Sequence, residues 1–269
     1  METYRLKNIV ILILVLLNIC LLALVASRSY AGHQADQALI NNTTALLQRN
    51  NISIDASLLE GTSSSLVYSY ARDDTAELEF VTTLLGPITT QSDYGGGTHF
   101  YANANGSASF RSNGSFSLTM TSELYAENFR EFIRAYCPAQ YRLNNIQNDG
   151  DRTIVTAIPY TDDFPVYNAS ITFIFEKQAL ISASGFLIPS AETTPEAAET
   201  ITRSSAVIYL MDHCNEEGRV CNTISEISAG YILQSTVSSP LLLTPVYRID
   251  TNTYSYYVNS ITGHVSLAG

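Results

Sequence analysis

The sequence contains no tryptophan, few charged residues and especially few basic ones. Charged residues make up 14% of the 269 positions, and 14 Lys+Arg stand against 25 Asp+Glu, which gives a formal net charge of −11. Nucleic-acid binding depends on clustered Lys and Arg that contact phosphates, so we expect no nucleic-acid partner. Hydrophobic residues make up 46% of the chain. That content excludes a disordered polyelectrolyte and is sufficient for a sizeable core.

Familiar catalytic and metal-binding motifs are also missing. The chain has no HExxH or GxSxG motif, and the glycine run at residues 95–97 lacks the Lys and Ser/Thr of a phosphate loop. Its four histidines show no metal-ligand spacing. The adjacent acids at residues 73–74 and 162–163 resemble turn residues more than the converging carboxylates of a hydrolase. The sequence therefore predicts no catalytic residue, no metal site and no cofactor, and the protein is not expected to be an enzyme.

One long hydrophobic run occupies residues 9–26, and only Asn18 and Cys20 interrupt it. A transmembrane helix needs about 17 to 25 apolar residues, so the run predicts a membrane anchor. Basic residues precede it, and the positive-inside rule then predicts a cytoplasmic tail at residues 1–8 and an extracytoplasmic remainder. The expected location is the cell membrane, with a single pass. A cleavable signal peptide is the alternative, although its apolar part is usually about 7 to 15 residues long.

Asn18 is the candidate contact residue of this anchor, because a polar amide inside a membrane can hydrogen-bond to a second helix. Cysteines are scarce outside the anchor, where only Cys137, Cys214 and Cys221 occur. Cys214 and Cys221 flank a turn-like stretch, and two alternatives remain open for them: a disulfide between the two, or buried free thiols. Three cysteines do not form the even-numbered framework of a disulfide-stabilised domain.

Hydrophobic periodicity alternates between helical and extended patterns along the rest of the chain. Asn-Gly pairs at residues 105–106 and 113–114 predict tight hairpins. Helices followed by antiparallel strands favour an α+β class, with two extracytoplasmic domains at residues 27–121 and 122–269, each with helices packed on an antiparallel sheet. Helices are predicted at residues 34–49, 75–85 and 123–136 and from residue 193 to about 211, and a linker at residues 189–195. Strands are predicted at residues 52–59, 65–71, 100–102, 108–110, 116–120, 154–158, 167–175, 179–187, 223–233, 242–250, 254–260 and 264–267.

Both ends of the chain resemble a known family. The anchor and the helix that ends at residues 46–52 (LLQRNNI) resemble the YycH/YycI family. Residues 244–249 (TPVYRI) and 256–265 (YYVNSITGHV) are similar to the closing hairpin of YycI-like domains, and also to the PepSY module. The middle of the chain matches only in architecture.

The resemblance implies a regulatory function without catalysis. Proteins of this family are membrane-anchored regulators of Gram-positive bacteria, and they hold in check a sensor histidine kinase that controls cell-wall metabolism. The expected partners are the membrane, that kinase and a sister regulator of the same family. The matching hairpin residues are expected to be structural: Pro245 at a strand start, Tyr247 and Tyr257 in packing, and Gly263 in a turn. The PepSY similarity keeps an alternative open, an exported binding or inhibitor module that acts on a protease or peptide.

Overall fold

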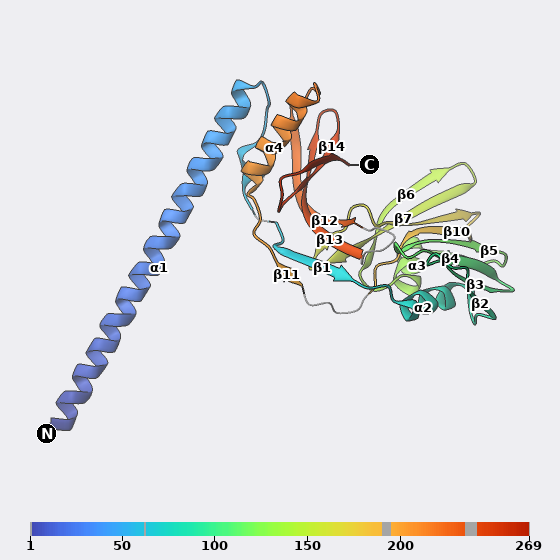
Figure 1. The fold of residues 1–269 in the computed structure, drawn as a ribbon, viewed down its shortest axis with the longest axis horizontal. Coiled ribbons are helices and arrows are strands. Elements are labelled where there is room, and N and C mark those ends of the chain that lie inside the picture. The colour runs from blue at the N-terminus through green and yellow to red at the C-terminus, as the bar shows by residue number, and fades with distance from the viewer. Residues whose placement is uncertain (1, 62, 190–194, 235–240, 269) are drawn as a thin grey trace.

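The protein consists of a long N-terminal helix followed by two antiparallel sheets with helices packed against them (Figure 1). A computed structural model describes residues 2–61, 63–189, 195–234 and 241–268. The predicted α+β class and the antiparallel pairing of its strands are confirmed. The predicted helix at residues 34–49 is also present, as the last part of a much longer helix.

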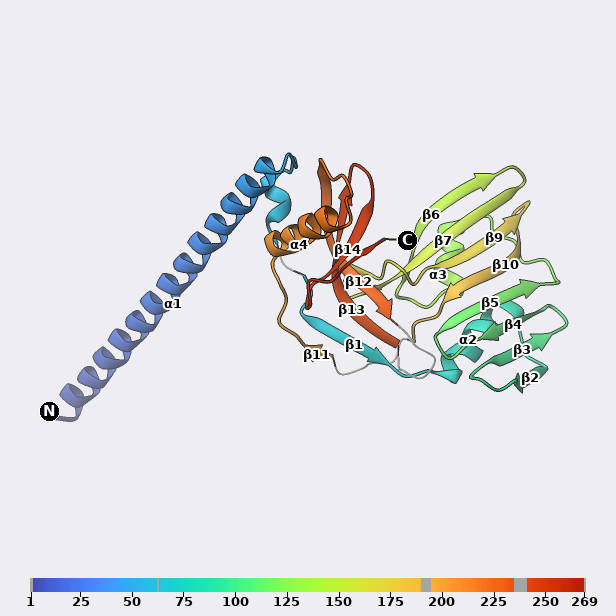
Figure 2. The same cartoon turned by 45° about the horizontal axis from the view of Figure 1, so that its top comes forward.

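The N-terminal helix α1 (Glu2–Arg49) projects away from the sheets, and near its end it packs against α4 (Arg203–Glu216) and the short helix η1 (Ala56–Leu59) (Figures 1 and 2). Ile40, Thr43 and Leu47 are buried, and their spacing places them on one helical face. The helix ends where Asn51 adopts a φ of 59° and the amide of Ile52 donates to the carbonyl of Leu47 over 2.9 Å. Within the described part of the chain, no helix has the length and hydropathy that crossing a membrane requires.

The six-stranded sheet combines one early strand with strands from the C-terminal part of the chain. Its order is β11-β1-β13-β14-β15, and β12 pairs with the other side of β13. The central strand β13 pairs with β12 along most of its length, while β1 and β14 share its second edge. Helix α4 packs on this sheet through Ala206, Val207 and Leu210. The bounds are β1 (Leu66–Tyr70), β11 (Glu196–Ala197), α4 (Arg203–Glu216), β12 (Ile224–Gln234), β13 (Leu241–Thr251), β14 (Ser255–Asn259) and β15 (Val265–Leu267).

The nine-stranded sheet is formed by the middle of the chain. Its order is β2-β3-β4-β5-β10-β9-β7-β6, and β8 pairs with β7. Helices α2 and α3 contribute Phe80, Leu84, Phe132 and Ile133 to the core that its strands line. The bounds are α2 (Asp74–Leu85), β2 (Thr90–Asp93), β3 (His99–Asn103), β4 (Gly106–Phe110), β5 (Ser115–Met120), α3 (Phe129–Tyr136), β6 (Tyr141–Asp149), β7 (Arg152–Thr161), β8 (Phe164–Pro165), β9 (Ile171–Glu176) and β10 (Ala179–Phe186).

The two sheets divide the chain differently from the domain boundary expected between residues 121 and 122. Strand β5 ends just before that position and pairs with β10 beyond it, so that Leu118 lies opposite Ala183. Strand β1 lies in the expected first domain but pairs with β13, where Tyr68 lies opposite Leu243. Any strand edge offers the same backbone hydrogen-bonding groups, so pairing between such distant segments leaves no signal in the local pattern.

Helix α3 is shorter than the helix predicted at residues 123–136. Asn128, and not Ser122, caps its start by accepting from the amides of Arg130 and Glu131. The segment before it is held by the start of β10 and the turn that precedes that strand. The amide of Leu180 donates to the carbonyl of Leu124 over 2.8 Å, and the amide of Ala126 donates to the carbonyl of Gln178 over 2.9 Å. This competing backbone partner explains why the helical pattern does not produce a helix over its full length.

Two other elements also differ from their predictions. The helix predicted from residue 193 starts later: Glu196–Ala197 is strand β11, and α4 begins at Arg203 behind the capping residue Thr202. Most of the predicted linker, residues 190–194, lies outside the described residues. Within the strand predicted at residues 52–59 the structure has a short 3₁₀ helix, η1 (Ala56–Leu59), because Asp55 accepts from the amide of Ser57 and caps a helical turn.

Candidate functional site

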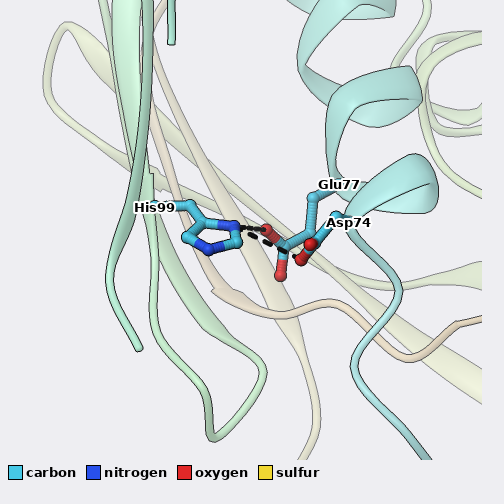
Figure 3. A group of neighbouring side chains, drawn as sticks. All are labelled: Asp74, Glu77 and His99. Atoms are coloured by element: carbon cyan, nitrogen blue, oxygen red, sulfur yellow. Dashed lines mark ion pairs between the residues drawn. The ribbon is translucent and has the colours of Figure 1, made fainter. Parts of the chain in front are cut away.

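A cluster of charged side chains lies where the chain leaves β1 and enters the nine-stranded sheet. Asp74 and Glu77 come from the first turn of α2, and His99 comes from the start of β3 (Figure 3). The Nδ1 atom of His99 lies 3.3 Å from Oδ1 of Asp74 and 3.7 Å from Oε2 of Glu77. Arg72, in the segment between β1 and α2, completes the cluster.

Local sequence positions these groups. Asp73 caps α2 by accepting from the amides of Thr75 and Ala76 at 2.9 and 3.1 Å, which fixes the start of the helix. Asp74 and Glu77 are then three residues apart and lie on the same helical face. The glycine run at residues 95–97 forms a turn with positive φ values, and the carbonyl of Gly97 accepts from Nη1 of Arg72 at 2.5 Å.

Arg72 supplies the positive charge at the centre of the cluster. Its Nε and Nη2 atoms donate to the two carboxylate oxygens of Glu77 at 2.8 and 2.9 Å, and Nε also lies 3.1 Å from Asp74. Glu77 is only 5% exposed. Burial raises the pKa of Glu77, although the pairing with Arg72 opposes that shift. Burial and the nearby Glu77 together raise the pKa of Tyr101 to about 12.

The ligand atoms of this cluster are close enough together to hold a metal ion, but the positively charged Arg72 already occupies the carboxylates. One ligand atom from each of Asp74, Glu77 and His99 falls within 4.8 Å of the others, and an imidazole with two carboxylates suits a divalent cation. Arg72 already pairs with both carboxylates and offsets one of their two negative charges, so a cation would have to displace its guanidinium. The cluster is therefore better explained as an ion-pair network that fastens α2 to the β2–β3 hairpin. Nδ1 of His99 is buried and has no hydrogen-bond partner among the described residues.

Sequence reasoning missed this cluster because its members come from separate elements. Asp73-Asp74 was interpreted as a turn, whereas Asp73 is the cap of α2 and Asp74 lies within the helix. The spacing of Asp74 and Glu77 was the available signal, but nothing local predicts the approach of His99. The other acidic pair does lie in a turn, where Asp162 and Asp163 have φ values of 48° and 63°.

A second feature is the contact between the two sheets. The segment after β8 lies along the outer edge of β12, where the amide of Tyr167 donates to the carbonyl of Tyr231 over 2.9 Å. The side chain of Asn168 binds both the carbonyl and the amide of Leu233, at 2.9 and 2.6 Å. Gly230 makes the close approach possible, since a Cβ atom there would lie 2.4 Å from the Tyr167 ring.

The anchor residue Asn18 lies in α1, away from the three cysteines that follow the anchor in the sequence. Nδ2 of Asn18 donates to the carbonyl of Leu14, one turn earlier in α1, over 2.9 Å. Cys20 is exposed, whereas Cys137, Cys214 and Cys221 are buried free thiols. Burial, followed by the neighbouring Cys214, raises the pKa of the Cys221 thiol to about 11. A thiol of such high pKa is a poor nucleophile at neutral pH.

The four hairpin residues of the C-terminal segment all lie in or beside the six-stranded sheet. Pro245 is inside β13 and not at its start. It lies between the residues of β13 that pair with β1 and those that pair with β14. Its missing amide hydrogen therefore breaks no bond on the edge of β13 that β1 and β14 share. Tyr247 is buried and donates to the carbonyl of Ile201 over 3.0 Å. Tyr257 stacks on Tyr167, with 5.5 Å between ring centroids. Gly263 occupies a turn with a φ of 73°.

These features define an α+β protein of two antiparallel sheets with a helical N-terminal extension. The chain belongs to the YycI protein family, whose model matches residues 34–261. The predicted resemblance is thereby confirmed. The family is a regulatory one, and membership supports a general role in the control of a two-component sensor-kinase system.

Solved structures with a related arrangement are distant in sequence. An uncharacterized protein from Eubacterium rectale is 14% identical, with a TM-score of 0.42, over 77% of this chain and 81% of that one. The C-terminal domain of YpeB from Bacillus megaterium is 9% identical, with a TM-score of 0.41, over 74% and 100%. YycH from Bacillus subtilis is 13% identical, with a TM-score of 0.39, over 74% and 51%. No curated protein matches the sequence of this chain.

Proposed function

We propose that this protein is a membrane-anchored extracytoplasmic regulator that binds and modulates a sensor histidine kinase of cell-wall homeostasis, and that it acts by binding and not by catalysis. Family membership over residues 34–261 is the observation that carries the proposal. The kinase, a sister regulator of the same family and the cell membrane are the proposed partners.

The character of α1 supports the anchored arrangement. Consecutive residues 14–17 are all apolar and at least half exposed, so the helix is hydrophobic around its circumference and not along one stripe. Leu22 and Leu24 continue this surface at 72% and 67% exposure. Such a helix needs an apolar surrounding, which a bilayer or a second helix supplies. The same helix ends against the core through the buried Leu47. A partner that contacts the first half of α1 would thereby be linked mechanically to the sheets.

Crosslinking in native membranes tests the kinase contact. Three full-length chains are compared: the unaltered protein, one whose residues 1–26 are replaced by an unrelated anchor, and Asn18→Leu. We expect the unaltered protein to capture a sensor kinase, and capture to fall severalfold in both altered chains. Cys20→Leu is the matched control, because Cys20 lies in the same hydrophobic run on nearly the opposite helical face and should leave capture unchanged.

The opposite result identifies the alternative. If no kinase is captured and the chain with the unrelated anchor still binds a protease or a peptide, the regulator proposal fails. The protein would then be an exported binding or inhibitor module, and its family membership would describe the fold alone.

A further inference from the structure

An open cavity of about 460 Å³ lies between α3 and the strands β6 and β7. Three arginines line it: Arg130 and Arg134 from α3, and Arg142 from β6. The remaining lining residues are apolar or tyrosine, and none is acidic. This is a high concentration of positive charge for a chain that has 14 basic residues and a net charge of −11.

The helix holds two of these arginines outside the core. Arg130 and Arg134 are four residues apart and therefore neighbours on one face. Phe132, at 4% exposure, fixes the opposite face of α3 against the nine-stranded sheet, and the buried Ile133 lines the cavity beside the two arginines. Neither Arg130 nor Arg134 forms an ion pair with any other residue in the described part of the chain. Their guanidinium groups remain available to a ligand.

The third arginine is already oriented. The guanidinium of Arg142 lies 4.3 Å from the centroid of the Tyr160 ring, and its Nη2 atom lies 3.0 Å from Oδ1 of Asp163. Both contacts restrict the side chain before any ligand arrives. Asp163 offsets one of the three positive charges, so the four groups together carry a net charge of two.

We propose that this cavity binds the phosphate group of a phosphate monoester. A phosphate monoester carries about −1.5 to −2 charges near pH 7 and three acceptor oxygens, which matches two net positive charges and several guanidinium donors. Arginine is suited to this role because its planar fork donates two parallel hydrogen bonds to phosphate. A carboxylate, with one charge and two oxygens, would leave part of the site uncompensated. The site is separate from the proposed kinase contact on α1, so either proposal can fail without the other.

Phosphorus NMR of inorganic phosphate tests the site on the full chain in a phosphate-free maltoside detergent. The unaltered protein should broaden the phosphate resonance in a saturable manner. Arg130→Gln and Arg134→Gln should each weaken binding at least tenfold. Asp163→Asn should tighten binding severalfold, because it removes the competing carboxylate while asparagine tolerates the φ of 63° at that position. Arg152→Gln, an exposed arginine at the β6–β7 hairpin, is the matched control and should bind as the unaltered protein does.

Competition identifies the source of the phosphate group. Displacement by glycerol 3-phosphate supports a soluble ligand, and displacement by micellar phosphatidic acid but not by phosphatidylcholine supports a lipid headgroup. Tighter binding of a tetraglutamate peptide than of phosphate would overturn the proposal in favour of an acidic protein segment. The proposal also fails if phosphate shows no saturable binding, or if Arg130→Gln and Arg134→Gln bind like the Arg152→Gln control while their unfolding temperatures are unchanged.

Discussion

Asn168 binds the main chain of Leu233 through both ends of its side-chain amide. Its Nδ2 atom donates to the carbonyl of Leu233 over 2.9 Å, and its Oδ1 atom accepts from the Leu233 amide over 2.6 Å. A side chain thus makes the pair of bonds that a neighbouring strand would otherwise make with the edge of β12. This pair joins the two sheets, because Asn168 precedes β9 in one and Leu233 belongs to β12 in the other.

Replacing this asparagine should weaken the connection between the sheets. Asn168→Ala removes two hydrogen bonds, each typically worth about 1 kcal/mol, from an edge whose Leu233 is buried. We expect the free energy of unfolding, measured by denaturant titration, to fall by about 1 to 2 kcal/mol. Asn144→Ala, at an exposed position of β6, is the control. Equal stability of the two variants would show that Asn168 does not support the junction.

The charged cluster should make stability depend on pH through Glu77. Burial raises the pKa of Glu77 in the folded protein above its pKa in the unfolded chain. The contribution of Glu77 to the free energy of unfolding is therefore fully present below the unfolded-state pKa, and it is lost as the pH rises through the folded-state pKa. Arg72→Met removes the group that opposes this shift and should raise the pKa of Glu77 further. We therefore expect the variant to lose more stability near pH 7 than near pH 4.5, as followed by denaturant unfolding at each pH.

The double variant Arg72→Met/Glu77→Gln provides the control for this prediction. It removes both partners and leaves no unpaired carboxylate at the buried position 77. Most of the stability lost near pH 7 should return. If the stability of Arg72→Met depends on pH in the same way as that of the unaltered protein, then Arg72 does not influence the pKa of Glu77.

The buried cysteines should be protected from alkylation in the folded protein. Burial raises the pKa of Cys221 to about 11 and that of Cys137 to about 12, so little thiolate is present near pH 8. With iodoacetamide and mass spectrometry, we expect Cys137, Cys214 and Cys221 to stay unmodified in the folded chain and to react fully after unfolding without a reductant. Modification of Cys214 and Cys221 only after reduction would instead show a disulfide between them.

Gly263 should tolerate no side chain while Tyr209 is present. Its φ is 73°, and a Cβ atom would lie 2.7 Å from the Tyr209 ring. Gly263→Ala combines a strained backbone with overpacking and should cost about 2 to 4 kcal/mol in thermal or denaturant unfolding. In a Tyr209→Ala background the cost should fall to about 1 to 2 kcal/mol. Gly150→Ala, at a φ of 62° with open space around it, measures the backbone cost alone.

Local patterns predicted many of the elements because they depend on near neighbours. The helix predicted at residues 75–85 differs from α2 by one residue, since Asp73 caps it and Gly86 follows it. Alternation at residues 171, 173 and 175 predicted a half-buried strand, and all three side chains are fully buried in β9. The helix predicted at residues 123–136 was wrong in its first part, since α3 begins only at Phe129. The residues before Phe129 form backbone hydrogen bonds with β10 and the turn before it instead of with a helix.

The sequence by itself determined the class of the fold, the family and most of the helices and strands, because periodicity, caps and turn residues act over a few positions. Only the tertiary structure decided which strands are neighbours, as in the pairing of β5 with β10 and of β1 with β13. It also brought Glu77 to His99, and Arg130 and Arg134 to Arg142. Every strand edge presents the same donors and acceptors, so the choice of partner depends on how all the side chains pack together, and no local pattern contains that information.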